Sequence, residues 1–449
     1  MIASPGGGMV MGQASSTWCG IGRSGSLRFH SDAAWSDADW AATSAASMTA
    51  VAMYTAASVE LRGKQYTTFR KAPVGIFAKL SCSGAVPAAL AAILLSAAGC
   101  SSPDESTSPE ASLEDDGTVR WSGQSVPYSA YGSEASRASL IALRDAPRLP
   151  SALSFSEGGA ELDEYRRQKN ETFYRPLLAK QLAAFPSKVT ERHVAGVRTL
   201  VVEPASGLSD DLRRKVLINL HGGSYVDGRG LGQQIESIPI AAVLGIRVIS
   251  VDYLLAPEHR FPAAVNQVVA VYGELLGEYS PESIGLYGCS AGGAMTGQVA
   301  ARLIHEDLPP PGAIGIFCEG MGPPFGVGDG AYMSHLLSGR TPPDILANPR
   351  KQLERVSYFR DTDYDDPLAF PLTSRGIYEQ FPPTLFVTGT RAHEMSNVAH
   401  AHVRLSSAGV QSRMYLWDGQ HHTFLYDPDL PESREAYALI ARFFEEWLR

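Results

Sequence analysis

The sequence predicts an α/β fold in which helices cover both faces of a mostly parallel sheet. From about residue 194 onward, short apolar runs rich in β-branched residues alternate with stretches of helical period. Such alternation, with near-continuous apolar strands, is typical of parallel strands that are buried on both faces. Gly and Pro punctuate the junctions between the runs. We therefore expect a three-layer α/β sandwich of roughly 250 residues.

The composition is that of a globular domain and excludes several other classes of protein. The chain has 449 residues, of which 44% are hydrophobic and 9% aromatic, enough for a large core. Its 38 basic and 47 acidic side chains give a net charge of −9. This charge disfavours nucleic acid as a partner, because phosphate binding requires a dense basic surface. The five cysteines form no CxxC pair, and they are too few for a disulfide framework.

The first hundred residues predict export. Residues 1–69 are rich in Ala, Ser and Gly without a sustained period, and we interpret them as a disordered or mis-annotated leader. Residues 70–100 combine a basic flank, a short apolar run and small residues before Cys100, in the order of a signal peptide. This ending resembles a bacterial lipobox, which implies lipidation of Cys100 and an exported, membrane-anchored lipoprotein, periplasmic or at the cell surface. A single membrane-spanning anchor is the alternative, although the run is near the lower length limit for one.

The remaining chain divides into three predicted parts. Residues 101–125 are polar and Pro-punctuated, which predicts a flexible tether. Residues 126–195 are more helical and polar and are interpreted as a helical cap, and residues 196–449 as the α/β domain. The strands expected in that domain are 197–202, 216–220, 248–252, 284–287, 313–317, 384–387 and 413–417. Helical stretches between them include 263–276, 294–305, 398–407 and 434–447.

A candidate nucleophile lies in the sequence Gly-Cys-Ser-Ala-Gly at residues 288–292. The motif directly follows one predicted strand and directly precedes a helix, which is the context of a nucleophile elbow. Its glycines leave room for a tight turn that lifts the Ser290 hydroxyl above the sheet. The N–H of Ala291, at the start of the helix, is then a candidate donor to an oxyanion.

A second glycine-rich turn follows the strand at 216–220, with the sequence His221-Gly222-Gly223-Ser224. Successive glycines allow the backbone to approach a substrate closely and to direct N–H groups toward it. We therefore predict Gly222 and Gly223 as further oxyanion donors, with a plain glycine turn as the alternative.

A third motif makes a resemblance to one family of proteins specific. Residues 251–264 read Val-Asp-Tyr-Leu-Leu-Ala-Pro-Glu-His-Arg-Phe-Pro-Ala-Ala. Together with the two glycine motifs, they resemble the hormone-sensitive-lipase-like (bacterial family IV) esterases of the α/β-hydrolase superfamily. The resemblance covers roughly residues 194–449. It implies a carboxylic-ester hydrolase without cofactor or metal, a cap-shaped pocket and short-chain acyl esters as substrates. For Asp252 and Tyr253 we expect a structural role, in a buried polar loop that braces the oxyanion loop.

The resemblance also implies a catalytic histidine, which in the family precedes a small residue and then Phe. In the sequence Gly-Gln-His-His-Thr-Phe at residues 419–424, His422 fits this pattern and His421 does not. Histidine is suited to moving the proton because its ordinary pKa lies close to neutrality. The order Ser290, acid, His422 agrees with the superfamily.

Three positions depart from the family pattern. Ser224 replaces a third glycine, and Cys289 replaces an aspartate beside the nucleophile and is interpreted as a packing residue. Ala392 stands where the family places its catalytic aspartate, and alanine cannot orient an imidazole. We predict that Glu394, the first carboxylate after the strand at 384–387, takes over this role.

Glu394 has several rivals in the sequence. It also lies at the start of a predicted helix, where a carboxylate is stabilised by the helix dipole without any catalytic role. Asp418 lies in the same short turn as His422, a position more typical of a carboxylate that braces a loop. The other carboxylates near the late strand precede it: Asp361, Asp363, Asp365 and Asp366.

Two other classes of function compete with a serine esterase. His393-Glu394 begins like a zinc-binding helix motif but lacks its second histidine, and His400 and His402 are spaced to point to different faces of a helix. The second rival is a non-catalytic binding protein with the same fold, since fold alone does not dictate function. We therefore expect a small-molecule ester to be the partner of this protein. Contact with a membrane is expected only through the lipid at Cys100.

Overall fold

The computed structural model describes residues 111–146, 149–322 and 327–449. The predictions for residues 1–69, for the signal and lipobox at 70–100, and for the first part of the tether lie outside these residues. None of the helices in the described ranges is both long enough and apolar enough to cross a membrane.

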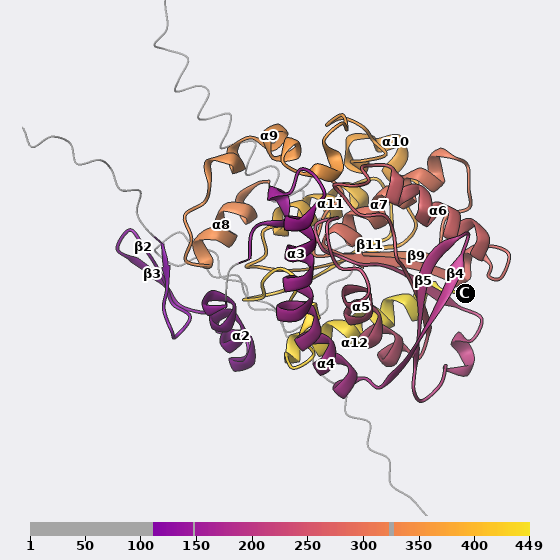
Figure 1. The fold of residues 1–449 in the computed structure, drawn as a ribbon, viewed down its shortest axis with the longest axis horizontal. Helices are drawn as coiled ribbons and strands as arrows, with labels where there is room; N and C mark the ends of the chain where they lie inside the picture. The colour runs from indigo at the N-terminus through magenta and orange to yellow at the C-terminus, as the bar shows by residue number, and fades with distance from the viewer. Residues whose placement is uncertain (1–110, 147–148, 323–326) are drawn as a thin grey trace, which may run out of the picture. The chain divides into compact units, whose positions relative to one another are not determined.

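An eight-stranded sheet forms the centre of the fold (Figure 1). Its spatial order is β11-β10-β9-β8-β6-β7-β5-β4. Strands β6 to β11 are parallel to one another, whereas β5 runs antiparallel to both β4 and β7. The strands are β4 (Ser187–Val194), β5 (Val197–Pro204), β6 (Val216–Leu220), β7 (Arg247–Val251), β8 (Ile284–Cys289), β9 (Ala313–Phe317), β10 (Thr384–Gly389) and β11 (Ser412–Trp417).

Helices cover both faces of the sheet, as predicted, and divide the core in two. Alternate residues of one strand enter opposite halves: Ile218 of β6 packs in the half formed with α6, α7 and α11, and Leu217 packs in the half formed with α5 and α12. These helices are α5 (Leu231–Leu244), α6 (Ala263–Leu275), α7 (Ala291–His305), α11 (Met395–Ser407) and α12 (Pro431–Trp447). The strand and helix pattern of the α/β prediction is therefore confirmed.

The predicted cap differs from the structure at its end. It contains the helices expected there, but residues 187–194 form β4, the outer strand of the main sheet, so the sheet begins nine residues before the predicted boundary at 196. In β4 the core-facing residues alternate with charged ones such as Lys188 and Glu191, because an edge strand is exposed on one side. The helices of this part are α2 (Glu134–Asp145), α3 (Ala160–Lys169), a π-helical turn (Asn170–Tyr174) and α4 (Arg175–Ala184).

Part of the predicted tether is folded. Residues 112–126 form a small antiparallel sheet of three strands, so the expectation of a flexible segment up to residue 125 is wrong for this stretch. Leu113 and Val119 bury their side chains against Leu140 of α2, and this apolar contact gives the short strands a core of their own. The strands are β1 (Ser112–Leu113), β2 (Val119–Trp121) and β3 (Gln124–Val126).

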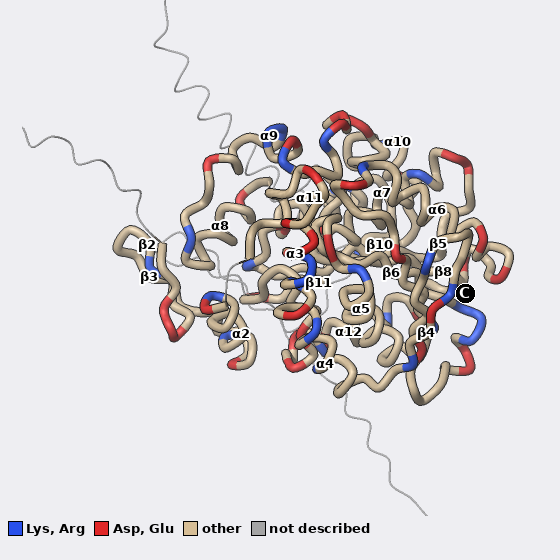
Figure 2. The backbone as a smooth tube through the Cα atoms, in the orientation of Figure 1, with Lys and Arg blue, Asp and Glu red and all other residues tan. Residues whose placement is uncertain are grey.

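Short helices fill the connection between β9 and β10. They are α8 (Asp329–Leu337), α9 (Pro349–Glu354), α10 (Arg375–Tyr378) and single 3₁₀ turns such as Asp344–Ala347. Charged residues of both signs are interspersed along the described backbone and are sparse in the central strands (Figure 2). Because parallel strands end at the same edge of a sheet, the loops after β6, β8, β10 and β11 come together at one place.

Candidate active site

The turn after β8 holds Ser290 in a strained backbone conformation. Its φ of +58° lies in the left-handed region, which non-glycine residues rarely adopt. The flanking glycines are required by space, since an added Cβ would lie 2.2 Å from the Leu220 carbonyl oxygen at Gly288 and 1.8 Å from it at Gly292. The strand, turn and helix predicted for residues 284–305 are thus present, and the turn places Ser290 at the start of α7.

Ser290, His422 and Glu394 form one hydrogen-bonded chain across three loops. Ser290 Oγ lies 3.0 Å from His422 Nε2, and His422 Nδ1 lies 2.9 Å from Glu394 Oε2. The other oxygen of Glu394 accepts a hydrogen bond of 3.1 Å from the Thr388 hydroxyl, which fixes the carboxylate. These distances are those expected for a nucleophile, its base and the acid that orients the base.

The electrostatics of the chain suit proton transfer at neutral pH. Burial opposes the charge on Glu394, but the charge of His422 and the hydrogen bond between them hold the pKa of Glu394 below its ordinary value. Burial also opposes protonation of His422, yet the Glu394 carboxylate raises the pKa of His422 above its ordinary value. The imidazole is therefore a stronger base than a free histidine, and the buried carboxylate stabilises the imidazolium.

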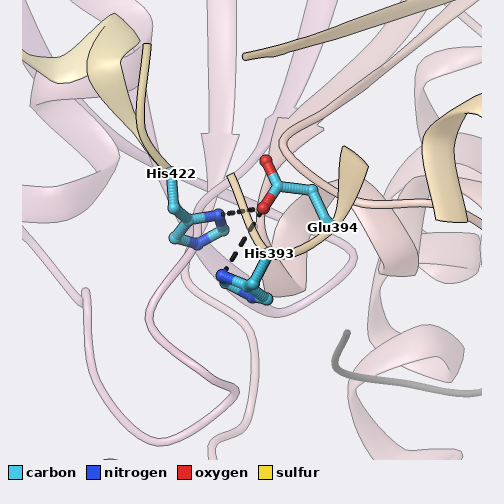
Figure 3. Close-up of side chains that lie close together, drawn as sticks. All are labelled: His393, Glu394 and His422. Carbon is cyan, nitrogen blue, oxygen red and sulfur yellow. Dashed lines mark hydrogen bonds and ion pairs between the residues drawn. The ribbon is translucent and has the colours of Figure 1, made fainter. Parts of the chain in front are cut away.

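A second histidine lies against this pair (Figure 3). His393 Nδ1 is 3.5 Å from Glu394 Oε2, and its ring centroid is 4.4 Å from that of His422. In the described part of the chain, His393, Glu394 and His422 are the one group with enough ligand atoms close together to hold a metal ion. Glu394 and His422 are already hydrogen-bonded to each other. Burial lowers the pKa of His393 to about 4, so that this ring is neutral near pH 7.

The rival carboxylates are occupied elsewhere. Asp418 accepts a hydrogen bond of 2.7 Å from Thr390 Oγ1 and another from the Ser129 hydroxyl, so it braces its loop as expected. Ala392 is buried in the turn after β10, two residues before Glu394. His421 contacts the carbonyl of its own neighbour and not Ser290. The carboxylates before β10 pair with basic side chains or with local backbone N–H groups: Asp361, Asp363, Asp365 and Asp366.

In the glycine-rich turn after β6, one of the two predicted oxyanion donors is already hydrogen-bonded to another group. The N–H of Gly222 donates to Oε1 of the buried Glu236 at 2.7 Å, so the prediction that Gly222 binds an oxyanion is wrong. Among the described residues, the backbone N–H groups of Gly223, Ser224 and Ala291 donate no hydrogen bond. Ser224 has a φ of +53°, a left-handed conformation that glycine adopts more readily than serine. Gly223 and Ala291 remain candidate donors, and Ser224 becomes a third.

The loop after β7 braces this turn, as the sequence predicted. Tyr253 donates a hydrogen bond of 2.5 Å to the His221 carbonyl oxygen and stacks on the His221 ring with centroids 4.2 Å apart. Asp252 is buried and forms ion pairs with Arg198 and Arg229. Cys289 is buried as well, and burial raises the pKa of its thiol, which agrees with a packing role.

A cavity of about 420 Å³ opens above Ser290 and His422. We call the segments that cover it, residues 151–154 and 329–355, the roof. The second of these segments was not expected from the sequence, because it contains neither a motif nor a long helical period. The lining residues are Ser151, Leu153, Ser224, Ser290, Ala331, His335, Pro343, Ile345, Leu346, Gln352, Arg355, His393 and His422.

Comparisons with known proteins agree with the fold. Residues 217–426 match the family model described as alpha/beta hydrolase fold. The chain is 26% identical over 278 residues to an esterase from Acinetobacter venetianus, a match that covers 60% of this chain and 87% of the relative. It is 32% identical over 126 residues to a putative acetyl-hydrolase, LipR, from Mycobacterium tuberculosis, covering 28% of this chain and only 40% of that protein.

A comparison with a solved structure is more specific about the family. The crystal structure of an esterase from the bacterial hormone-sensitive lipase family matches with a TM-score of 0.56 and 26% identity, over 69% of this chain and 96% of that one. In fold and sequence the chain is similar to the bacterial hormone-sensitive-lipase esterases. The resemblance and the fold predicted from the sequence are therefore confirmed, and ester hydrolysis is confirmed as the activity of the family.

Proposed function

We propose that this esterase hydrolyses short-chain carboxylic esters through a covalent acyl-enzyme on Ser290, with His422 as base and Glu394 as the orienting acid. The observation that carries the proposal is the hydrogen-bonded chain from Ser290 Oγ through His422 to Glu394, at 3.0 and 2.9 Å. The alternative is a binding protein of the same fold. The strained backbone of Ser290 argues against it, because strain of this kind is stored where a reactive group must be presented.

The reaction proceeds in two halves. Ser290 Oγ attacks the acyl carbon while His422 Nε2 takes the hydroxyl proton, and the carbonyl oxygen becomes an oxyanion. The N–H groups of Gly223, Ser224 and Ala291 stabilise this charge. The intermediate then expels the alcohol, which takes its proton from His422. Water enters, His422 takes one of its protons, and the second tetrahedral intermediate releases the acid and restores Ser290.

The cavity supports a preference for small acyl groups. Its roof places apolar side chains beside the space above Ser290, among them Leu153, Ile345 and Leu346. Apolar walls of this kind discriminate modestly against each methylene that they cannot accommodate. One curated relative of the chain carries the name acetyl-hydrolase, which agrees with a small acyl group.

A panel of p-nitrophenyl esters from acetate to decanoate tests the proposal, with wild type beside Ser290→Ala. We expect wild type to turn over the acetate and butyrate esters fastest and the decanoate ester slowest. A fluorophosphonate probe, which reacts only with an activated serine, separates the two candidate functions. Absence of labelling of the folded wild-type protein would favour the binding protein.

We also propose that the mature protein begins at Cys100 and is held at a membrane by lipid. The support is the order of basic, apolar and small residues before that cysteine in the sequence. Metabolic labelling with a palmitate analogue, comparing wild type with Cys100→Ser, tests this. Equal labelling of the two proteins, or a mature N-terminus elsewhere, would reject it.

A further inference from the structure

Three loops must keep their relative positions for the proposed reaction. The turn after β6 carries the oxyanion donors, the turn after β8 carries Ser290, and the loop after β11 carries His422. Their backbones come from separate strands, and the Ser290 N–H is tied to the neighbouring strand β9 through the Phe317 carbonyl oxygen at 2.8 Å. A group that contacts all three loops at once is therefore a candidate for setting the geometry of the site.

The carboxylate of Glu236, on α5, makes a hydrogen bond in, or at one end of, each of the three loops. Its Oε1 accepts the Gly222 N–H at 2.7 Å and the Tyr426 hydroxyl at 2.5 Å. Its Oε2 accepts the backbone N–H of Cys289, the residue before Ser290, at 3.3 Å. Tyr426 lies in the 3₁₀ turn Phe424–Tyr426, directly after the His422 loop.

A fourth contact shows that the carboxylate is surrounded by donors. Asn219 Nδ2 donates to Glu236 Oε2 at 3.1 Å. The orientation of this amide follows from its oxygen, which accepts hydrogen bonds from the Ser237 and Ser250 hydroxyls at 3.2 and 2.6 Å. Glu236 thus receives four hydrogen bonds, and these favour the ionised carboxylate. Burial opposes them and raises the pKa of Glu236 to about 7.

The surrounding space leaves no room for a side chain at Gly222. A Cβ at Gly222 would lie 2.6 Å from the Tyr426 hydroxyl and 2.8 Å from the Cys289 carbonyl oxygen. The Glu236 side chain is buried, and neither Glu236 nor Gly222 is among the residues that line the cavity above Ser290. Its effect on a substrate is therefore indirect.

We propose that Glu236 is a positioning residue that aligns the oxyanion donors, Ser290 and His422 by hydrogen-bonding to all three loops behind the site. This inference rests on the proposed serine mechanism. It also explains how a cysteine can stand at position 289, where the family pattern has an aspartate beside the nucleophile. The carboxylate that binds this turn comes from Glu236 on α5 instead.

Glu236→Gln keeps the size of the side chain and replaces one acceptor oxygen with an NH₂ group, which then faces donors. Glu432→Gln is the matched control. Glu432 is also buried and accepts hydrogen bonds from Ser133 N, Ser133 Oγ and Ser136 Oγ, which join α12 to α2. Its link to the three loops is only indirect, through Ser136, which accepts a hydrogen bond from Gln420 Nε2 at 2.9 Å. Both variants lose buried hydrogen bonds, and only one of them loses the alignment.

The readout is kcat per reactive serine, counted by stoichiometric fluorophosphonate labelling, together with KM for p-nitrophenyl acetate and the melting temperature. Counting the reactive serines removes the effect of any unfolded fraction. We expect Glu236→Gln to lower kcat by about 10², comparable with the loss of one oxyanion donor, with KM changed less than threefold. Glu432→Gln should lower the melting temperature and leave kcat per reactive serine unchanged.

A second variant keeps the test decisive if Glu236→Gln does not fold. Tyr426→Phe removes one of the four donors without opening a cavity, and we expect kcat to fall about tenfold. Values of kcat within threefold of wild type, in whichever of these variants fold, would overturn the positioning role. If wild type itself neither turns over esters nor reacts with the probe, the proposed function fails first, which is a separate result.

Discussion

The edge of the sheet that carries Ser290, His422 and Glu394 is constructed differently from the roof that covers it. Strands β8 and β10 are buried at every position, and the Glu394 side chain is buried as well. In the roof, α8 buries only Gly330 and Ala331, α9 buries only Gln352 and Leu353, and the 3₁₀ turn Asp344–Ala347 buries no residue. The edge is thus held by the core of the protein, and the roof by a few partial contacts.

This difference in burial suggests that the edge of the sheet determines the proposed reaction and that the roof determines which substrates fit. A group held by the core keeps its geometry within a fraction of an ångström, as proton transfer requires. Segments with little burial are the ones that open locally at small cost in free energy. Substitutions at the edge should therefore affect kcat or folding strongly, and substitutions in the roof should change the choice of substrate.

The largest effect is expected at the nucleophile. Ser290→Ala should lower kcat for p-nitrophenyl acetate by about 10⁶ while the circular dichroism spectrum stays that of wild type, because the acyl-enzyme cannot form. Steady-state assays at high enzyme concentration measure this loss. Turnover above one thousandth of wild type in a carefully purified variant would rule out the serine mechanism.

The next effect concerns folding at the same edge. Gly292→Ala should destabilise the protein by about 3 kcal/mol or abolish folding, since its Cβ would meet the Leu220 carbonyl oxygen at 1.8 Å. The control is Gly273→Ala in α6, where an added Cβ meets nothing within 4 Å. That variant should be stabilised by about 0.4–1 kcal/mol. Urea unfolding compares the two, and equal stabilities would contradict the packing described for the turn.

A roof substitution should act on selectivity. Leu346→Trp places a larger side chain in the cavity, and kcat/KM for the butyrate ester should fall about tenfold relative to the acetate ester. Val403→Trp is the control, because Val403 is 58% exposed on α11 and does not line the cavity. If both variants show the same acetate-to-butyrate ratio as wild type, the roof does not select the acyl group.

The smallest effect is expected at His393. Activity should decline as the pH falls through the raised pKa of His422, since the protonated imidazole cannot accept the proton from Ser290. His393 is already neutral at these pH values, because burial lowers its pKa to about 4. The acid limb of kcat/KM in His393→Gln should therefore lie within about 0.3 pH units of wild type. A larger displacement would show that both rings titrate together.

The strands with full burial could be predicted almost to the residue, because short, mostly apolar runs such as Val216–Leu220 suit a strand that is buried on both faces. Strand β4 was missed since its charged residues alternate with apolar ones at an exposed edge. The donor role of Gly222 was wrong for a different reason. Glycine leaves the backbone torsions open, so the direction of its N–H depends on Glu236, which lies 14 residues away in the chain.

In the candidate site, too, some features could be predicted from the sequence and others could not. Ser290 and His422 follow from motifs attached to strand ends, and Glu394 followed from being the first carboxylate after β10. The roof segment at 329–355 has no such signal, because its place over the cavity depends on contacts between distant parts of the chain. Local sequence therefore predicts the reacting groups better than it predicts what surrounds them.

The identity of the orienting acid is the central claim, and one comparison tests it directly: kcat of Glu394→Gln beside Asp418→Asn, both assayed with p-nitrophenyl acetate. Each substitution removes one carboxylate charge and keeps the size of the side chain. Glu394→Gln should lower kcat by about 10⁴, because His422 loses the partner that fixes its tautomer. Asp418→Asn should stay within tenfold of wild type. A near wild-type Glu394→Gln beside an inactive Asp418→Asn would contradict the assignment.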